Sequence, residues 1–332
     1  MINIRPFISI IIPAKDNNRY VEECISHCKK LDYSLYEIII LPDNPLPINW
    51  EDVKIVPTGP VVPSEKRDKG IKIAKGEILA FLDDDAFPSP DWLRNAATHF
   101  QNEEVAAVGG PAVTPQSDTL RQKASGFVYS SFLGGGNYRY RYIPTSLREM
   151  DDYPTCNLLV RKSILEDLGG FGSLFWPGED TVLCLNITQK LGKKIVYDPS
   201  VLVYHHRRPL FLSHLKQIKN YALHRGYFVK HFPETSLRLS YLLPSLLVIA
   251  LVGGTVVSLF NLFLRVFFLS LVLLYLGLVF LSSIRLKHLT VSLLVFPGIL
   301  LTHFTYGAFF MQGLLVRKLQ NGGADQVHKT TT

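Results

Sequence analysis

The sequence predicts an α/β fold with a mainly parallel sheet, followed by helices that span a membrane. Short runs rich in Ile, Val and Leu alternate with helical patterns over residues 1–205, which is typical of a buried parallel sheet. Polar and acidic residues follow directly after three of these runs. By contrast, the 76 residues from 241 to 316 contain no Asp or Glu and only three charged residues: Arg265, Arg285 and Lys287.

The elements of the α/β part are short. We expect strands, in order, at Phe7–Ile12, Glu37–Leu41, Val53–Val56, Ile78–Leu82, Val105–Val108 and Lys194–Tyr197. Helical patterns lie at about 19–30, 65–75, 90–100, 161–168 and 179–191. The first run is six residues long and ends at Pro13, which is the length of a strand and too short for the core of a signal peptide.

Composition narrows the class of protein. Residues 241–332 carry six basic residues and one acid, so the first 240 hold 35−6 = 29 basic and 28−1 = 27 acidic residues. The positive charge therefore comes mostly from the apolar end, which argues against a nucleic-acid-binding protein with a pervasive basic patch. It also argues against a disordered chain and a wholly soluble one. The four cysteines do not form a disulfide framework, and we expect them to be reduced packing residues.

Two apolar runs, Leu242–Phe260 and Leu262–Ile284, are long enough to cross a bilayer that needs ~20 residues, and we expect a hairpin turning near 259–265. A third run, Leu289–Val316, contains a Pro-Gly pair and a His, so it is expected to be kinked or partly re-entrant. A buried all-helical domain is the alternative, and the near absence of charge disfavours it. A multi-pass membrane protein with its N-terminal part on the cytoplasmic side places the Arg285–His288 link inside, as the positive-inside rule prefers. Three full spans would place Arg317 and Lys318 outside, against that rule, and this conflict stays open.

Four segments follow from these patterns. They are a catalytic domain at 1–208, an amphipathic interfacial helical segment at 209–240, transmembrane helices at 241–316, and a polar tail at 317–332. Within the second segment, Phe211, Leu215, Ile218 and Ala222 share one helical face beside several basic residues. A basic amphipathic helix next to a bilayer lies in its interface, and an ordinary surface helix is the alternative.

Polar strand ends converge on one edge of the predicted sheet, where ligands of such folds bind. Ala14 to Asp16 follow the first strand, Asp43 follows the second, and Asp83-Asp84-Asp85 follow the fourth. Three acids at the tip of a buried strand repel one another, and a divalent cation relieves the repulsion. Mg²⁺ and Mn²⁺ prefer oxygen ligands, and Asp83 and Asp85 are spaced so that both can point the same way in an extended segment.

Two further clusters carry candidate chemistry. Glu179-Asp180 opens a helix, where acids are also favourable simply as capping charges. His205-His206-Arg207-Arg208 follows another apolar run. His can bind a metal and Arg can hold phosphate, while a basic stop before the membrane is the alternative.

These motifs, in this order, resemble glycosyltransferase family 2, the inverting enzymes with the GT-A fold, over roughly residues 7–232. The matching segments are Ser9–Pro13, Arg67–Gly70, Ala74–Asp85, Pro88–Leu93, Cys156–Arg161, Gly169–Phe171, Gly178–Asp180 and Tyr204-His205. The first loop departs from the family in reading Ala-Lys-Asp for the usual Thr-Tyr-Asn, and the second strand ends in a single Asp. The Gln-x-x-Arg-Trp motif of processive synthases is not seen, which favours addition of a single sugar.

The resemblance implies roles by position. Asp180 would be the general base, with Glu179 as its neighbour or substitute. Ala14, Asp16, Asp43 and Arg67 would line or support the nucleotide pocket, and Asp83, Asp84 and Asp85 would contact ribose and metal–diphosphate. The metal ligands would be Asp83, Asp85 and His205, the phosphate-binding residues Arg207 and Arg208, and the acceptor-side residues Cys156, Asn157 and Trp176.

The resulting hypothesis is a membrane-anchored inverting glycosyltransferase that uses Mn²⁺ or Mg²⁺. It would move one sugar from a nucleotide-diphosphate sugar to a hydroxyl of a lipid-linked or glycan acceptor, with membrane lipids as further partners, no nucleic acid, and an oligomer possible. One alternative is a polyprenyl-phosphate sugar synthase, in which phosphate attacks and no general base is needed. Another is a non-catalytic nucleotide-sugar-binding partner subunit.

Overall fold

The computed structural model describes residues 5–172, 175–284 and 288–319. Its strands are β1 Ile8–Pro13, β2 Tyr36–Leu41, β3 Val53–Ile55, β4 Ile78–Leu82, β5 Ala86–Pro88, β6 Val105–Gly109, β7 Ala112–Val113, β8 Arg148–Met150, β9 Asn157–Arg161, β10 Lys194–Tyr197 and β11 Val203–His205. Its helices are α1 Arg19–Cys28, α2 Pro63–Ile73, α3 Trp92–His99, α4 Leu120–Ser130, α5 Phe132–Gly135, η1 Gly136–Arg141, α6 Lys162–Leu168, α7 Glu179–Leu185, η2 Asn186–Lys190, α8 Leu212–His231, α9 Pro233–Ser236, α10 Leu239–Ser258, α11 Leu262–Ser283 and α12 Leu289–Leu315.

The described chain forms two compact units. The sheet unit comprises residues 5–113 and 143–205, and the helical unit comprises 114–142 and 206–319. Residues 114–142 therefore pack with the C-terminal helices. The predicted catalytic domain at 1–208 had included them.

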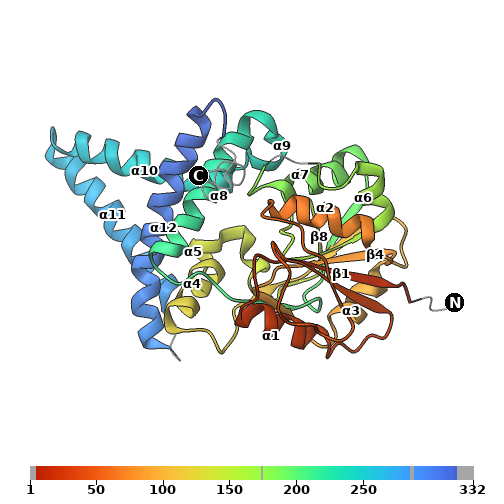
Figure 1. Cartoon of the computed structure of the whole chain (residues 1–332). Helices are drawn as coiled ribbons and strands as arrows, with labels where there is room; N and C mark the ends of the chain where they lie inside the picture. The colour runs from red at the N-terminus through yellow and green to blue at the C-terminus, as the bar shows by residue number, and fades with distance from the viewer. Residues whose placement is uncertain (1–4, 173–174, 285–287, 320–332) are drawn as a thin grey trace, which may run out of the picture. The chain divides into compact units, whose positions relative to one another are not determined.

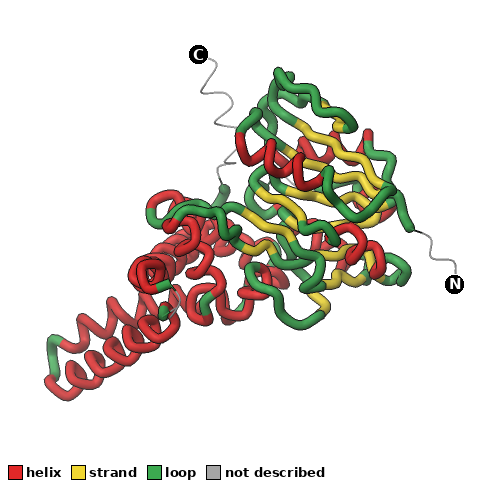
Figure 2. The backbone as a smooth tube through the Cα atoms, turned by 90° about the horizontal axis from the view of Figure 1, so that it is seen from below, coloured by secondary structure: helices red, strands yellow, loops and turns green. Residues whose placement is uncertain are grey.

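The sheet unit is an α/β fold around an eight-stranded sheet in the order β3-β2-β1-β4-β9-β6-β10-β8 (Figures 1 and 2). The β3-β2, β2-β1, β1-β4 and β6-β10 pairs are parallel, so the predicted mainly parallel sheet is confirmed. All residues of β1 and β4 are buried, because helices cover both faces and the strands need apolar side chains on both. The six predicted strands are present within two residues of their expected ends.

A second, three-stranded sheet in the order β5-β11-β7 places the end of the last strand beside the acidic turn. In its register His205 lies opposite Ala86, the residue that follows Asp83-Asp84-Asp85. Phe87 and Tyr204 stack with ring centroids 5.1 Å apart, which holds this register. The four cysteines are free and buried, as predicted.

The helical unit is built around α12, which packs along α8 and against α4, α10 and α11. α10 and α11 form the expected hairpin, joined at Leu259–Asn261, and lie side by side (Figures 1 and 2). Three helices, α10, α11 and α12, are long and apolar enough to cross a membrane among the residues described. Ile218 and Ala222 of the predicted amphipathic face are buried within this unit.

The α8–α12 crossing depends on two glycines. A Cβ at Gly313 would lie 2.2 Å from the carbonyl oxygen of Leu223, and one at Gly226 would lie 2.1 Å from that of Phe310. We therefore expect Gly313→Ala to push the helices apart and to destabilise the fold by ~1–3 kcal/mol. The measurement is the melting temperature in detergent. Gly277→Ala in α11 is the matched control, because nothing lies within 4 Å of its added methyl group. Equal melting temperatures for the two variants would contradict the close crossing.

Candidate active site

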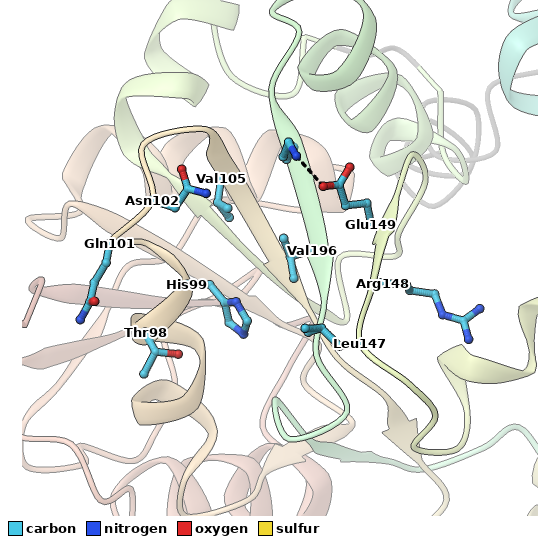
Figure 3. A pocket seen from close by; sticks show the side chains of 10 residues that line it. Thr98, His99, Gln101, Asn102, Val105, Leu147, Arg148, Glu149 and Val196 are labelled. Atoms are coloured by element: carbon cyan, nitrogen blue, oxygen red, sulfur yellow. Dashed lines mark hydrogen bonds and ion pairs between the residues drawn. The ribbon is translucent and has the colours of Figure 1, made fainter.

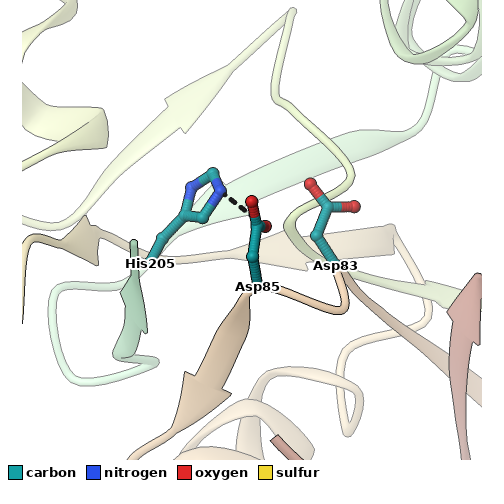
Figure 4. A group of neighbouring side chains, drawn as sticks. All are labelled: Asp83, Asp85 and His205. Carbon is teal, nitrogen blue, oxygen red and sulfur yellow. Dashed lines mark ion pairs between the residues drawn. The ribbon is translucent and has the colours of Figure 1, made fainter. Parts of the chain in front are cut away.

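Asp83, Asp85 and His205 form a three-residue group at the carboxyl end of β4 (Figure 4). One potential ligand atom from each residue lies within 4.8 Å of the others, and His205 Nε2 is 3.0 Å from Asp85 Oδ1. The acids stand on the turn after β4, and the histidine ends β11. Two carboxylates and an imidazole fit a divalent cation such as Mn²⁺, which takes oxygen ligands readily and accepts nitrogen. The structure brings together the three residues that the sequence suggested as metal ligands.

Arg67 lies at the centre of the site's charges. Its guanidinium is buried and donates to Asp83 Oδ1 at 3.1 Å and to Glu179 Oε1 at 2.8 Å. Burial alone would lower the pKa of Arg67, but Glu179, Asp83 and Asp180 outweigh it and raise that pKa above its ordinary value. The resemblance assigned Arg67 to the nucleotide pocket, and in the structure it links α2, the acidic turn after β4 and the start of α7.

The two acids of α7 have different surroundings. Glu179 is buried, pairs with Arg67 and accepts a hydrogen bond from the backbone N–H of Gly178. Asp180 is partly exposed and accepts from the N–H of Thr181 at 2.8 Å. Both stand in the first turn of a helix, where the dipole favours the carboxylate. The Glu179 carboxylate is thus held by the buried cation of Arg67, and the charge of Asp180 also acts on that cation.

Lys66, which sequence reasoning did not select, organises the strand ends of β1 and β2. Its side chain is 5% exposed, and its ammonium donates to the backbone oxygens of Ala14 and Leu41 and to Asp43 Oδ1. All three N–H donors are therefore used, and the carboxylate of Asp43 is fixed in orientation. Helical spacing is the sequence signal that could have identified Lys66 as buried. Lys66 lies four residues before Gly70, so the two residues share the face of α2 that packs on Ile11 of β1.

The residues assigned to the acceptor side are not alike. Asn157 is fully buried, and its amide bonds to the oxygens of Gly110 and Val201 and to the Trp92 indole N–H. The side-chain amide of Asn157 therefore makes hydrogen bonds within the protein core, and Cys156 is buried as well. Trp176 is 41% exposed, which leaves its ring open to a ligand. In the first loop Asp16 is also exposed.

The two arginines after His205 belong to the helical unit. Arg208 is exposed, whereas Arg207 is buried, stacks on Tyr142 at 4.9 Å and donates to Thr114 Oγ1 at 3.3 Å. Asp118 binds the imidazole of His206 and the backbone N–H of Arg207. This buried aspartate, separated by 88 residues from its histidine partner, fixes the chain where it leaves β11.

An open groove of about 650 Å³ lies elsewhere on the sheet unit (Figure 3). It is lined by residues near the amino ends of β6 and β10, among them His99, Lys194 and Glu149, and none of the predicted site residues reaches it. The group of Asp83, Asp85 and His205 stands at the opposite edge of the sheet, where the strands have their carboxyl ends and where sheets of this type bind ligands. The groove is therefore not the candidate active site.

The chain is similar to known glycosyltransferases. The model of glycosyl transferase family 2 matches residues 9–169. The chain is 26% identical over 166 residues to the pre-mycofactocin glycosyltransferase of Mycobacterium tuberculosis, covering 50% of this chain but only 33% of that protein. It thus spans about a third of the length of this relative. It is 25% identical over 249 residues to the dolichyl N-acetyl-α-D-glucosaminyl phosphate 3-β-D-2,3-diacetamido-2,3-dideoxy-β-D-glucuronosyltransferase of Methanococcus voltae, covering 68% of this chain and 74% of that one.

A solved structure shares the architecture. It is a mannosyltransferase from Pyrobaculum calidifontis in complex with GDP-Man and Mn²⁺. The TM-score is 0.64 at 17% sequence identity, over 95% of this chain and 89% of that one. At this identity the likeness establishes the fold, which is GT-A, and no more.

Proposed function

Since residues 9–169 are a glycosyltransferase family 2 domain, we propose that the chain is a membrane-anchored inverting glycosyltransferase with Asp180 as its general base. It moves one sugar from a nucleotide-diphosphate donor to a hydroxyl of an acceptor, which we take to be lipid-linked. The observation that carries the proposal is the division of the acids around Arg67. Glu179 and Asp83 share that buried cation, Asp85 stands beside His205, and Asp180 opens α7 with a partly exposed carboxylate next to this cluster.

The metal and nucleotide sites follow from the same residues. Asp83, Asp85 and His205 would hold Mn²⁺ or Mg²⁺, which when bound offsets negative charge on the leaving diphosphate. The carboxylate that Lys66 orients, Asp43, would accept a hydrogen bond from a donor N–H of the nucleobase. The Pyrobaculum enzyme that shares the fold was solved with Mn²⁺ and GDP-Man, which supports this assignment.

Transfer is then a single displacement. The acceptor oxygen bonds to the anomeric carbon as the bond from that carbon to the diphosphate oxygen breaks, and the hydroxyl proton passes to Asp180. The nucleoside diphosphate leaves with the bonding electrons, and attack from the opposite face inverts the anomeric centre. The fixed donors of the site act without reorganisation, which is the main source of electrostatic catalysis.

The acceptor and the location are inferred from the helical unit. Two or three apolar helices anchor the chain in a membrane, and we place the sheet unit on the cytoplasmic side. The Methanococcus relative is named for transfer onto a dolichyl-linked sugar, which supports a lipid-linked acceptor here. The exposed guanidinium of Arg208 would contact a phosphate of the acceptor.

Binding of the donor is expected to raise the melting temperature, because a ligand that binds only the folded state stabilises it. At a concentration 100 times its Kd, the matching nucleotide sugar adds ~2.7 kcal/mol of stability. The measurement is a thermal-shift series with UDP- and GDP-sugars, with and without Mn²⁺, followed by product analysis with a lipid-linked acceptor. Binding of a donor without any transfer would favour the non-catalytic partner subunit, and no binding of any donor would refute the proposal.

A further inference from the structure

α12 is as long and apolar as a membrane span, yet its neighbours differ from those of α10 and α11. In the most apolar 18-residue stretch of each helix, 33% of α12 is buried, against 11% for α10 and 6% for α11. Its partner is α8, which carries Lys216, Lys219 and Lys230. The question is therefore whether α12 crosses the bilayer at all.

The two helices run parallel, in register over four contact points. His214 Nε2 is 2.9 Å from Thr302 Oγ1, and the Lys219 ammonium lies 4.7 Å from the centre of the Phe309 ring. Further along, Gly226 meets Gly313, and Lys230 donates to the carbonyl oxygen of Val316. If the second half of α12 entered the hydrocarbon, α8 would enter with it. The exposed side chains of Lys216 and Lys219 would then lie in lipid, at a cost of several kcal/mol each.

The hairpin meets α12 at its base. At the amino end of α10, Ser245 Oγ donates to the Gly307 carbonyl at 3.0 Å, and Tyr241 packs with Phe310. At the carboxyl end of α11, Tyr275 bonds His303 at 2.8 Å and Phe280 packs on Phe296.

On α12, the midpoint of the α10 contacts and the midpoint of the α11 contacts are about nine residues apart, or ~13 Å. This separation is comparable with the 8–10 Å between the axes of packed helices. α12 therefore runs across the pair, from one hairpin helix to the other, as Figure 1 shows. The parts of the hairpin far from its base are exposed, with Val252 at 64% and Phe263 at 75%.

Charge and exposure give α12 a lipid-facing side. The exposed residues of α12 are mostly apolar: Leu289, Leu293, Leu301, Phe304, Ala308 and Leu315, with Thr290 and Gln312 as the polar ones. In the sequence of the helical unit, 114–142 and 206–319, there are 16 Lys and Arg but only two acids, Asp118 and Glu234. A strongly basic unit with an apolar side on α12 suits the headgroup boundary of an anionic bilayer.

We propose that only the α10–α11 hairpin crosses the membrane and that α12 lies in the plane of the bilayer, at the face where the hairpin enters. The proposal rests on the membrane anchorage proposed above. Helices of 20 and 22 residues are ~30 and ~33 Å long, which matches a hydrocarbon core of ~30 Å. Arg317 and Lys318 then stay on the side of the sheet unit, because no other candidate span precedes α10 in the described residues. This removes the conflict with the positive-inside rule.

Labelling of added cysteines in sealed vesicles tests this topology. The variants are Ser26→Cys in the sheet unit, Phe260→Cys at the hairpin turn and Lys318→Cys after α12, all at exposed positions. The four native cysteines are buried, so the unaltered chain gives the background with a membrane-impermeant maleimide. Ser26→Cys and Lys318→Cys should label from the same face, and Phe260→Cys from the opposite face, whatever the vesicle orientation.

Labelling of Lys318→Cys from the same face as Phe260→Cys would overturn the proposal and make α12 a third span. Labelling of all three from one face would overturn the crossing of the hairpin. Release of the chain from the vesicles by alkaline carbonate would instead refute membrane anchorage itself. Donor binding, measured by thermal shift on the same preparations, reports on the proposed enzyme independently of either result.

Discussion

Replacement of Asp180 by Asn is expected to lower the rate of transfer to a hydroxyl acceptor by ~100- to 10,000-fold, the usual contribution of a general base. Asn has the same shape, and its side-chain oxygen can still accept the hydrogen bond from the Thr181 N–H. The start of α7 is therefore preserved, while the group that removes the proton is lost. The measurement is kcat with saturating donor and acceptor, and the thermal shift caused by donor and Mn²⁺ should be unchanged.

Glu179→Gln provides the contrast. This substitution leaves the buried guanidinium of Arg67 with one anionic partner fewer, and breaking a buried pair costs ~3–5 kcal/mol. We therefore expect a lower melting temperature for Glu179→Gln, and a specific loss of kcat for Asp180→Asn. The reverse pattern would make Glu179 the base.

Unchanged turnover of Asp180→Asn would favour the polyprenyl-phosphate alternative. A phosphate oxygen is already anionic at neutral pH, so its attack on the anomeric carbon needs no proton removed. The acceptor used in the assay therefore matters. A lipid-linked sugar with a free hydroxyl and a bare polyprenyl phosphate should be compared side by side.

The fold was predictable where burial leaves a continuous mark on the sequence. β1, β2, β4 and β6 are apolar runs that are covered on both faces, and each was expected at its place. β5, β7 and β8 are two or three residues long, too short for any periodic pattern. β9 joins directly to α6 without a turn signal, so its antiparallel place between β4 and β6 was missed.

The site was predictable in part, for a similar reason. Asp83, Asp85 and His205 stand at strand ends, so topology alone brings them to one edge of the sheet. The pairing of Arg67 with Glu179 joins residues 112 positions apart, and no local pattern in either segment predicts this pairing. Lys66 is a buried cation on a helix, and a charged residue there is by default read as solvated. Long-range pairing of charges is therefore the part of the site that only the folded chain reveals.

Replacement of Asp85 by Ala is expected to weaken Mn²⁺ binding by ~100-fold or more and to lower transfer at limiting Mn²⁺ at least as much, since altering even an outer partner of a ligand costs 10- to 100-fold. Asp85 contributes more than Asp83, because part of the charge of Asp83 is neutralised by Arg67. Asp83→Ala should bind Mn²⁺ better than Asp85→Ala does, but it should melt at a lower temperature because Arg67 loses a partner.

The measurement for this pair is a titration of free Mn²⁺ by electron paramagnetic resonance, together with melting curves. Asp167→Ala, which removes an exposed acid of α6, is the matched control for charge and should keep the Mn²⁺ affinity of the unaltered chain. If Asp85→Ala retains that affinity, the cation does not bind at this triad. If Asp83→Ala binds Mn²⁺ more weakly than Asp85→Ala, Arg67 does not withdraw charge from the metal site, and its role is confined to holding α7.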